Sequence, residues 1–130
     1  MSPVGDANLS MRGVPMTDRK MLIVEDEAIV ALDLELHFEL AGFVPTVATS
    51  VQQALATLAS MPVDFALLDY HVGGEDTAPV AVALKELRIP FAVCSGSQIA
   101  DLGEAFAGVE NIGKPFSSEA LDETVKRLLS

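Results

Sequence analysis

Several short apolar runs in this chain end in polar residues that can bind a cation or a phosphate group. These residues are Glu25 and Asp26, Asp69, Ser95 and Lys114. Carboxylates brought close together repel one another, and a hard cation with oxygen ligands, such as Mg²⁺, relieves that repulsion. One carboxylate can then attack phosphorus as a nucleophile, while a hydroxyl and an ammonium group neutralise charge on the transferred phosphoryl group. These residue types predict Mg²⁺-dependent phosphoryl chemistry, provided that the fold brings them together.

Asp69 is the centre of this set. It ends the run Phe65–Asp69, in which four apolar residues precede the acid, and the polar loop 70–76 follows at once. A short apolar run bounded by a turn is typical of a strand that is buried on both faces. The last residue of such a strand lies at the carboxyl edge of a sheet, where open α/β folds place ligands and chemistry. We therefore expect the other polar residues to act together with Asp69.

The elements that position these residues alternate between strand and helix. The predicted strands are Lys20–Val24, 44–49, Phe65–Asp69, Phe91–Cys94 and 109–112. The predicted helices are Ala28–Leu40, 50–59, 77–87, a weak one at 99–106, and a last one capped by Ser117 or Ser118. Alternating β and α units build a parallel sheet with helices on both faces and right-handed crossovers. The polar strand ends would then meet at one edge of that sheet.

Apolar spacing and capping residues predict details of the individual helices. Ile29, Leu32, Leu36 and Leu40 recur at helical spacing and mark an apolar stripe on the first helix, and Gly42 is placed to end it. Ser50 and Gln53 are predicted to form a capping box at the start of the second helix. Thr77 is predicted to cap the third helix, whose first turn can accommodate Pro79. The apolar face of the helix 77–87 would hold Val80, Leu84 and Leu87.

His71 has more than one interpretation, whereas His37 and Cys94 each have one. His71 lies two residues after Asp69, and its side chain could tune the lifetime of a phosphoryl group, accept a phosphoryl group or simply be solvated. His37 lies at helical spacing from Asp33, which predicts a surface pair. Cys94 is predicted to be a small buried strand residue, because nothing near it indicates a reactive thiol or a zinc site.

Composition excludes several classes of function. The chain has 130 residues, half of them apolar, and a formal net charge of -11 from 8 basic and 19 acidic residues. Such a balance argues against non-specific nucleic-acid binding and against anionic membranes, both of which need a basic face. No run approaches the roughly 18 apolar residues of a membrane span. With a single cysteine and no signal-peptide core near the N-terminus, we expect a soluble cytoplasmic protein.

The domain organisation is expected to be simple. Residues 1–19 are rich in Gly, Pro, Ser and Asp without periodicity, which is typical of a flexible N-terminal arm or a cloning remnant. Residues 20–130 show no repeat and no linker, so we predict one domain with one core there.

Short motifs at the polar strand ends resemble those of the receiver domain of two-component response regulators. They are residues 22–27 (LIVEDE), 67–69 (LLD), 95–96 (SG) and 114–116 (KPF). They occur in the order and spacing of that family and extend the resemblance over residues 20–130. The resemblance implies an α/β fold of the flavodoxin-like (βα)5 type, a doubly wound parallel sheet with strand order 2-1-3-4-5.

The resemblance also implies roles for the acidic residues. Asp69 would be the phosphoacceptor and a ligand of Mg²⁺. Asp26 would bind Mg²⁺ directly, and Glu25 through water. The backbone carbonyl of His71, two positions after the acceptor, would be a further ligand.

The remaining roles implied by the resemblance concern the phosphoryl group. Ser95 would be the switch hydroxyl, and Lys114 would pair with the phosphoryl group, with a cis bond between Lys114 and Pro115. Receivers usually carry Tyr or Phe where this chain has Asn111, and Pro where it has Gly73. The missing aromatic residue leaves the switch mechanism open.

Part of the sequence resembles one subgroup of receivers more closely. Residues 73–75 and 89–91 are similar to the single-domain subgroup named FAT GUY, whose Phe-Ala-Thr-Gly sequence corresponds here to Val93-Cys94-Ser95-Gly96. The match in that segment is therefore partial.

The function implied by the resemblance is signalling, not enzymatic turnover, apart from weak self-phosphorylation and self-dephosphorylation. The donor would be a histidine kinase or a histidine phosphotransfer protein. Because the sequence ends with the last predicted helix, we expect a single-domain regulator that docks onto a downstream protein or acts as a phosphate sink or relay. We expect a monomer or a weak homodimer.

Three other functions remain as alternatives. One is a receiver-like interaction module that is never phosphorylated, which the missing aromatic residue leaves open. A second is a Mg²⁺-dependent phosphatase with an aspartyl nucleophile, but such enzymes typically have a second acid where this chain has His71. The third is flavin or nucleotide binding, for which the glycine-rich loop after the first strand is absent.

Overall fold

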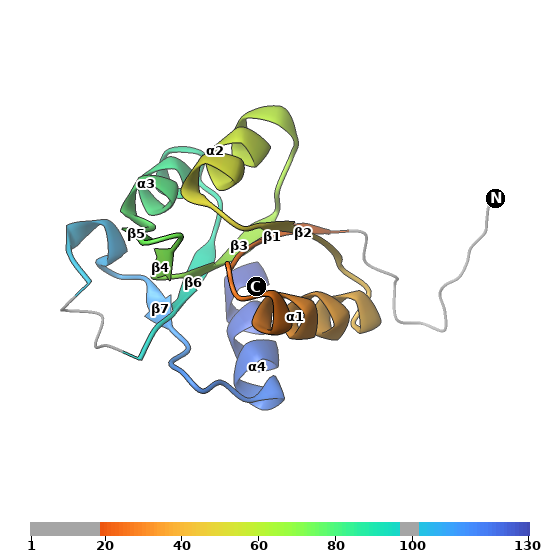
Figure 1. The fold of residues 1–130 in the computed structure, drawn as a ribbon. Coiled ribbons are helices and arrows are strands. Elements are labelled where there is room, and N and C mark those ends of the chain that lie inside the picture. Colours follow the sequence, from red (N-terminus) through yellow and green to blue (C-terminus); the bar gives the residue numbers. More distant parts are fainter. Residues whose placement is uncertain (1–18, 97–101) are drawn as a thin grey trace.

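Five parallel strands form the central sheet, in the order β2-β1-β3-β6-β7 (Figure 1). Their bounds are β1 (Lys20–Val24), β2 (Val44–Ala48), β3 (Phe65–Asp69), β6 (Phe91–Cys94) and β7 (Glu110–Asn111). The two other strands, β4 (His71–Val72) and β5 (Glu75–Asp76), form a separate antiparallel hairpin. Leaving out this hairpin, the order along the sheet is 2-1-3-4-5, so the predicted flavodoxin-like topology is confirmed.

The structure is a computed structural model that describes residues 19–96 and 102–130. The predicted N-terminal arm lies outside the described residues, except for Arg19. The same holds for the first part of the weak helix predicted at 99–106.

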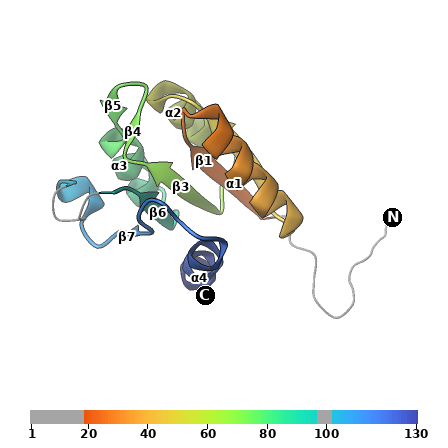
Figure 2. The ribbon, with the colours of Figure 1, turned by 60° about the horizontal axis from the view of Figure 1, so that its bottom comes forward.

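Helices cover both faces of the sheet. On one face lie α2 (Val51–Ser60) and α3 (Ala78–Glu86), and on the other lie α1 (Ala28–Leu40) and α4 (Ser118–Leu129) (Figure 1). The β4–β5 hairpin lies beside α3, beyond the end of β3 (Figure 2). Because crossovers between parallel strands are right-handed, the face on which a connecting helix lies depends on the direction in which the chain moves along the sheet, which reverses after β2. Because the strands are parallel, the ends of β1, β3 and β6 share one edge of the sheet.

The three central strands, β1, β3 and β6, are buried on both faces, and their side chains alternate between two apolar clusters. Leu22 and Val24 pack with α2 and α3, whereas Met21 and Ile23 pack with α1 and α4. This is the period of two that a strand imposes on its side chains. Because both faces of these central strands are covered, their sequences are almost continuously apolar, which made them recognisable in the sequence.

The apolar stripe predicted on α1 points into solvent, so the predicted face is not the packing face. Ile29 is 81% exposed, Leu32 54%, Leu36 48% and Leu40 88%. The helix packs on the sheet through another set: Ala31, Leu34 and Phe38. Both faces of α1 are apolar, so periodicity alone could not choose between them.

The choice of face follows from aromatic packing. The ring of Phe38 is fully buried and meets the rings of Phe43 and Phe65 edge-on, with centroids 5.9 and 6.3 Å away. A large aromatic ring buries more apolar area than a leucine and gains from edge-to-face geometry. Phe38 therefore fixes the rotation of α1, and the other stripe is left outside.

Two of the predicted helix caps are confirmed. The Ser50 hydroxyl accepts a hydrogen bond from the Gln53 N–H at 3.0 Å, although the Gln53 side chain bonds to the Thr49 N–H and hydroxyl and not to Ser50. Ser117, and not Ser118, caps α4 by accepting from the Ala120 N–H at 3.1 Å. Each cap satisfies an N–H group that has no partner within the helix.

The third and fourth crossovers differ from their predictions. Val80 and Leu84 of α3 are buried as expected, but Leu87 lies at the end of the helix and is exposed. In the fourth crossover, the described residues contain only a short 3₁₀ turn, η2 (Glu104–Phe106). Gly103 precedes it with a φ of 98°, a left-handed value that no right-handed helix includes. The predicted helix cannot continue through this position.

Among residues 19–96 and 102–130, the structure contains no helix with the length and apolar character needed to cross a membrane.

Candidate acidic site

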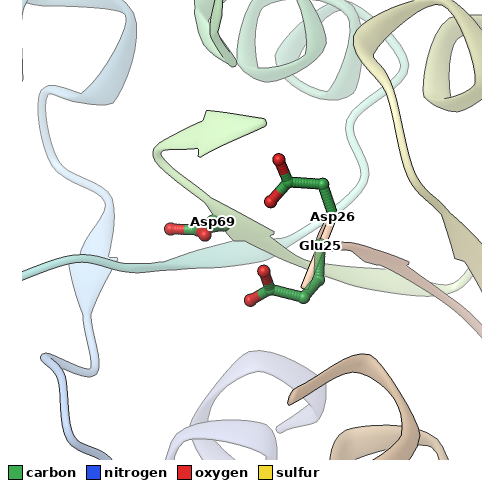
Figure 3. A group of neighbouring side chains, drawn as sticks. All are labelled: Glu25, Asp26 and Asp69. Atoms are coloured by element: carbon green, nitrogen blue, oxygen red, sulfur yellow. The ribbon is translucent and has the colours of Figure 1, made fainter. Parts of the chain in front are cut away.

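The carboxyl edge of the sheet brings together four of the polar residues predicted to act together. Glu25 and Asp26 follow β1, Asp69 ends β3, and Lys114 follows β7. Figure 3 shows the three acids, whose carboxylates are directed toward the same side. One ligand oxygen from each of the three carboxylates lies within 4.8 Å of those of the others.

The acids differ in exposure. The Glu25 side chain is 2% exposed and that of Asp69 15%, while Asp26 is open to solvent. Burial raises the pKa of the Glu25 carboxyl, although a hydrogen bond from the Glu27 N–H partly offsets this, and the charge of Asp69 raises it further. A hard cation with oxygen ligands would remove this repulsion, so the donor set fits Mg²⁺.

Backbone N–H groups orient the carboxylates. The Tyr70 N–H donates to Oδ1 of Asp69 at 2.8 Å, and the Gly73 N–H donates to Oδ2 of Asp26 at 2.9 Å. Gly73 and Gly74 connect β4 and β5 with φ values of 64° and 82°. Positive φ at both positions of a two-residue hairpin loop is typical of a type I′ turn.

The substitution of Gly73 for the usual proline thus has a structural consequence. Proline has no N–H group and its ring fixes φ near about −65°. It could neither adopt the turn nor donate to Asp26. The contact joins residues 47 positions apart, so the sequence carried no signal for it.

Lys114 supplies positive charge to the acidic cluster. Its Nζ atom lies 3.0 Å from Oδ2 of Asp69 and 3.5 Å from Oε1 of Glu25. Burial lowers the pKa of Lys114, but the hydrogen bond to Asp69 and the charges of Asp69 and Glu25 outweigh this effect and raise it overall. The ammonium group is therefore charged at neutral pH. The peptide bond between Lys114 and Pro115 is cis, as predicted.

Ser95 lies next to the acids at the end of the neighbouring strand. Asp69 and Cys94 are register partners on β3 and β6, and Ser95 follows directly and is buried. Among residues 19–96 and 102–130, no heavy atom beyond the chain neighbours of Gly96 lies within 4 Å of the position that a Cβ would take on Gly96. The Ser95 N–H donates to Oδ1 of Asn111 at 3.1 Å.

Thr77 is a residue of this site whose role the sequence did not indicate. Its side chain is fully buried, and its hydroxyl donates to the backbone carbonyls of Asp69 at 2.8 Å and Tyr70 at 3.2 Å. The prediction that the Thr77 side chain caps α3 is therefore wrong. The Asp76 carboxylate instead accepts a hydrogen bond from the Ala78 N–H at 2.9 Å. Thr77 holds the end of β3 against the start of α3.

The two remaining candidates from the sequence are His71 and Cys94. The exposed His71 ring meets the Tyr70 ring edge-on at 4.5 Å, and Tyr70 in turn meets the buried Phe106 of η2 at 5.3 Å. The ligand role of the His71 carbonyl stays a prediction. Burial raises the pKa of the Cys94 thiol to about 12, so this buried strand residue is a neutral thiol at physiological pH.

Curated proteins of known name show similarity to this chain, although no family model matches it. The transcriptional regulatory protein PrrA of Mycobacterium bovis and that of Mycobacterium tuberculosis are each 29% identical over 119 residues. The alignment covers 88% of this chain and 51% of each relative. The chain thus spans about half the length of the curated relatives it matches.

Several solved response regulators have the same fold as this chain. A response regulator receiver protein from Sinorhizobium medicae is 28% identical, with a TM-score of 0.76 over 86% of this chain and 94% of that one. Chemotaxis response regulator CheY4 of Vibrio cholerae has a TM-score of 0.77 at 20% identity, over 87% of this chain and all 100% of its own.

A third similar structure was solved with ligands. Response regulator protein TrrA of Thermotoga maritima, in complex with Mg²⁺-BeF, has a TM-score of 0.76 at 22% identity, over 85% of this chain and 99% of that one. At such identities the CheY4 and TrrA structures establish the fold alone. Together with the relatives of higher identity, they show that this chain is similar to the receiver domains of two-component response regulators.

Proposed function

We propose that Asp69 accepts a phosphoryl group from a phosphohistidine, in a reaction that depends on Mg²⁺. The observation that carries this proposal is the arrangement around Asp69. One carboxylate oxygen each of Asp69, Glu25 and Asp26 lies within 4.8 Å of the other two. The Oδ2 atom of Asp69 also lies 3.0 Å from the ammonium nitrogen of Lys114. A merely structural acid at a strand end needs neither two further acids nor a lysine.

The residues of the site have separable tasks in this reaction. The Tyr70 N–H holds Oδ1 of Asp69, which fixes the orientation of the carboxylate. One Asp69 oxygen attacks phosphorus; the new O–P bond forms as the P–N bond to the donor imidazole breaks, and the electron pair stays on that nitrogen. Lys114 and the Ser95 hydroxyl then neutralise charge on the phosphoryl oxygens.

The acids would hold the metal ion. Glu25, Asp26 and Asp69 supply the side-chain oxygens, and the His71 backbone carbonyl is the further ligand that we propose. When bound, Mg²⁺ would neutralise charge on the phosphoryl group and on the acids. The presence of Mg²⁺-BeF in the TrrA structure, which has the same fold, supports this choice of ion.

The exposed stripe on α1 supports a helical protein as the donor. Four large apolar side chains lie in line on its outer face: Ile29, Leu32, Leu36 and Leu40. Exposed apolar residues that lie next to each other mark interaction surfaces, whereas isolated ones do not. Acids on the same helix, Asp33, Glu35 and Glu39, favour a basic rim on the partner. We infer docking to the helices of a histidine kinase or phosphotransfer protein, which would place the chain in the cytoplasm.

The state of Asp69 would then be passed on by docking to a downstream protein, or the domain would relay or drain phosphoryl groups. Whether it belongs to the FAT GUY subgroup and acts as a single domain stays a prediction, based on residues 73–75 and 89–91.

Intact mass spectrometry after incubation with acetyl phosphate and Mg²⁺ tests the proposal, with Asp69→Asn as the matched control. We expect one phosphoryl adduct that requires Mg²⁺ and is absent from the variant. A wild-type chain that neither binds Mg²⁺ nor gains an adduct would favour a phosphorylation-independent interaction module. If Mg²⁺ binds without an adduct, a phosphorylated histidine phosphotransfer domain replaces acetyl phosphate as the donor and decides.

A further inference from the structure

Asn111, at the position where receivers usually carry an aromatic residue, makes two hydrogen bonds with one atom. Its Oδ1 atom accepts from the Ser95 N–H at 3.1 Å and from the Gly113 N–H at 3.0 Å. Asn111 ends β7, where it is the register partner of Val93 on β6. A carboxamide oxygen has two lone pairs, so one oxygen can serve both donors.

The two donors belong to the two loops that carry the phosphoryl-binding groups. One is the N–H of Ser95 itself, in the loop after β6. The other, Gly113, directly precedes Lys114, whose Nζ atom reaches Asp69. One side-chain oxygen therefore joins the hydroxyl-bearing loop to the lysine-bearing loop across the edge of the sheet.

The local backbone is built for this contact. A side-chain oxygen of Asn that accepts from the N–H two residues later forms an Asx turn. Gly113, the donor residue of this turn, has a φ of 86°, which a residue with a Cβ rarely takes. Neither Phe nor Tyr carries an acceptor that can reach its own backbone in this way.

We propose that Asn111 is a positioning residue for phosphoryl transfer: it fixes the Ser95 loop and the Lys114 loop relative to each other, so that hydroxyl and ammonium approach the same phosphoryl group. This inference rests on the proposed function of Asp69. It gives the chain a polar connection between the two loops at the position where receivers usually have an aromatic side chain.

Two substitutions separate the hydrogen bonds from the shape of the side chain. Asn111→Leu has nearly the same size and no acceptor, whereas Asn111→Asp keeps the acceptor oxygens. In Asn111→Leu we expect hydrogen exchange of the Ser95 and Gly113 amides to become at least about tenfold faster, with protection retained in Asn111→Asp. Initial phosphorylation by acetyl phosphate should be about tenfold slower in Asn111→Leu than in the wild type.

Affinity for Mg²⁺ distinguishes positioning from general damage to the site. The acids lie at the carboxyl ends of β1 and β3, so Asn111→Leu should bind Mg²⁺ within about twofold of the wild type, whereas a misfolded variant would lose binding. Wild-type phosphorylation rates or retained amide protection in Asn111→Leu would overturn the inference. A wild-type chain that takes no phosphoryl group would count against Asp69 as acceptor, and amide exchange would still decide whether Asn111 joins the loops.

Discussion

The ammonium nitrogen of Lys114 lies 3.0 Å from Oδ2 of Asp69, although the two residues are 45 positions apart in the sequence. The same nitrogen lies 3.5 Å from Oε1 of Glu25. Lys114 thus supplies positive charge to two crowded carboxylates.

Replacing Lys114 by Met should separate its two effects. Loss of a charged donor that stabilises the transition state typically slows a reaction by about 100-fold, so phosphorylation of Asp69 by acetyl phosphate should fall by that order. Mg²⁺ should bind more tightly, because the site loses a positive charge that competes for the same oxygens. Calorimetric titration with Mg²⁺ measures the second effect, and Lys126→Met on the exposed side of α4 is the control. Weaker Mg²⁺ binding in Lys114→Met would contradict this account.

Glu25→Gln should stabilise the protein when Mg²⁺ is absent. Burial raises the pKa of Glu25, so its charged form is unfavourable in the folded state at neutral pH. Removing the charge should raise the Tm by a few degrees, which corresponds to a gain of about 1 kcal/mol in the free energy of unfolding for a domain of this size. Thermal unfolding with and without Mg²⁺ measures it, and Mg²⁺ should stabilise the wild type far more than the variant.

The pH dependence of stability gives an independent test of Glu25. Between its usual value of 4.5 and its raised pKa, the folded state binds more protons than the unfolded state, so stability without Mg²⁺ should fall as the pH rises through that window. Glu110 acts in the opposite sense below 4.5, because the hydrogen bond from Arg127 lowers its pKa. The difference in slope between the wild type and Glu25→Gln therefore gives the contribution of Glu25. The same slope in Glu25→Gln would contradict the assignment.

Two leucines of α1 test which face of the helix packs on the sheet. Leu34 is buried against the sheet, while Leu36 is about 200° further round the helix and is exposed. Leu34→Ala should lower the free energy of unfolding by about 3 kcal/mol, and Leu36→Ala by less than about 0.5 kcal/mol. Urea unfolding of the two variants, which have the same change of residue on one helix, gives the comparison. Equal losses would mean that α1 packs differently.

The outer face of α1 should govern transfer from a protein donor and not from a small molecule. With Leu32 and Leu36 both changed to Gln, transfer from a phosphorylated histidine phosphotransfer domain that labels the wild type should slow by at least about tenfold, as for the loss of a central interface residue. Labelling by acetyl phosphate should be unchanged. Val82→Gln, an exposed apolar position on α3, is the control. Equal slowing in the control would contradict docking on α1.

The sequence by itself determined the order of strands and helices and the residues at the strand ends. Strands buried on both faces are apolar throughout, so Phe65–Asp69 and Lys20–Val24 could be delimited to the residue. Alternation of β and α then determines that the carboxyl ends of parallel strands share one edge, because crossovers are right-handed. Glu25, Asp26 and Asp69 could therefore be placed together without coordinates.

Only the tertiary structure decided which partners each side chain finds. Helical spacing suggested Asp33 as the partner of His37. In the structure, the Nε2 atom of His37 instead lies 2.8 Å from Oδ1 of Asp122 on α4. Periodicity likewise marked an apolar stripe on α1 and could not say that Phe38, on the opposite face, packs on the sheet. The bonds of Asn111 and Thr77 also join separate loops. Local patterns describe one element at a time, whereas these contacts depend on how two elements pack, and packing is decided by shape and volume across the whole core.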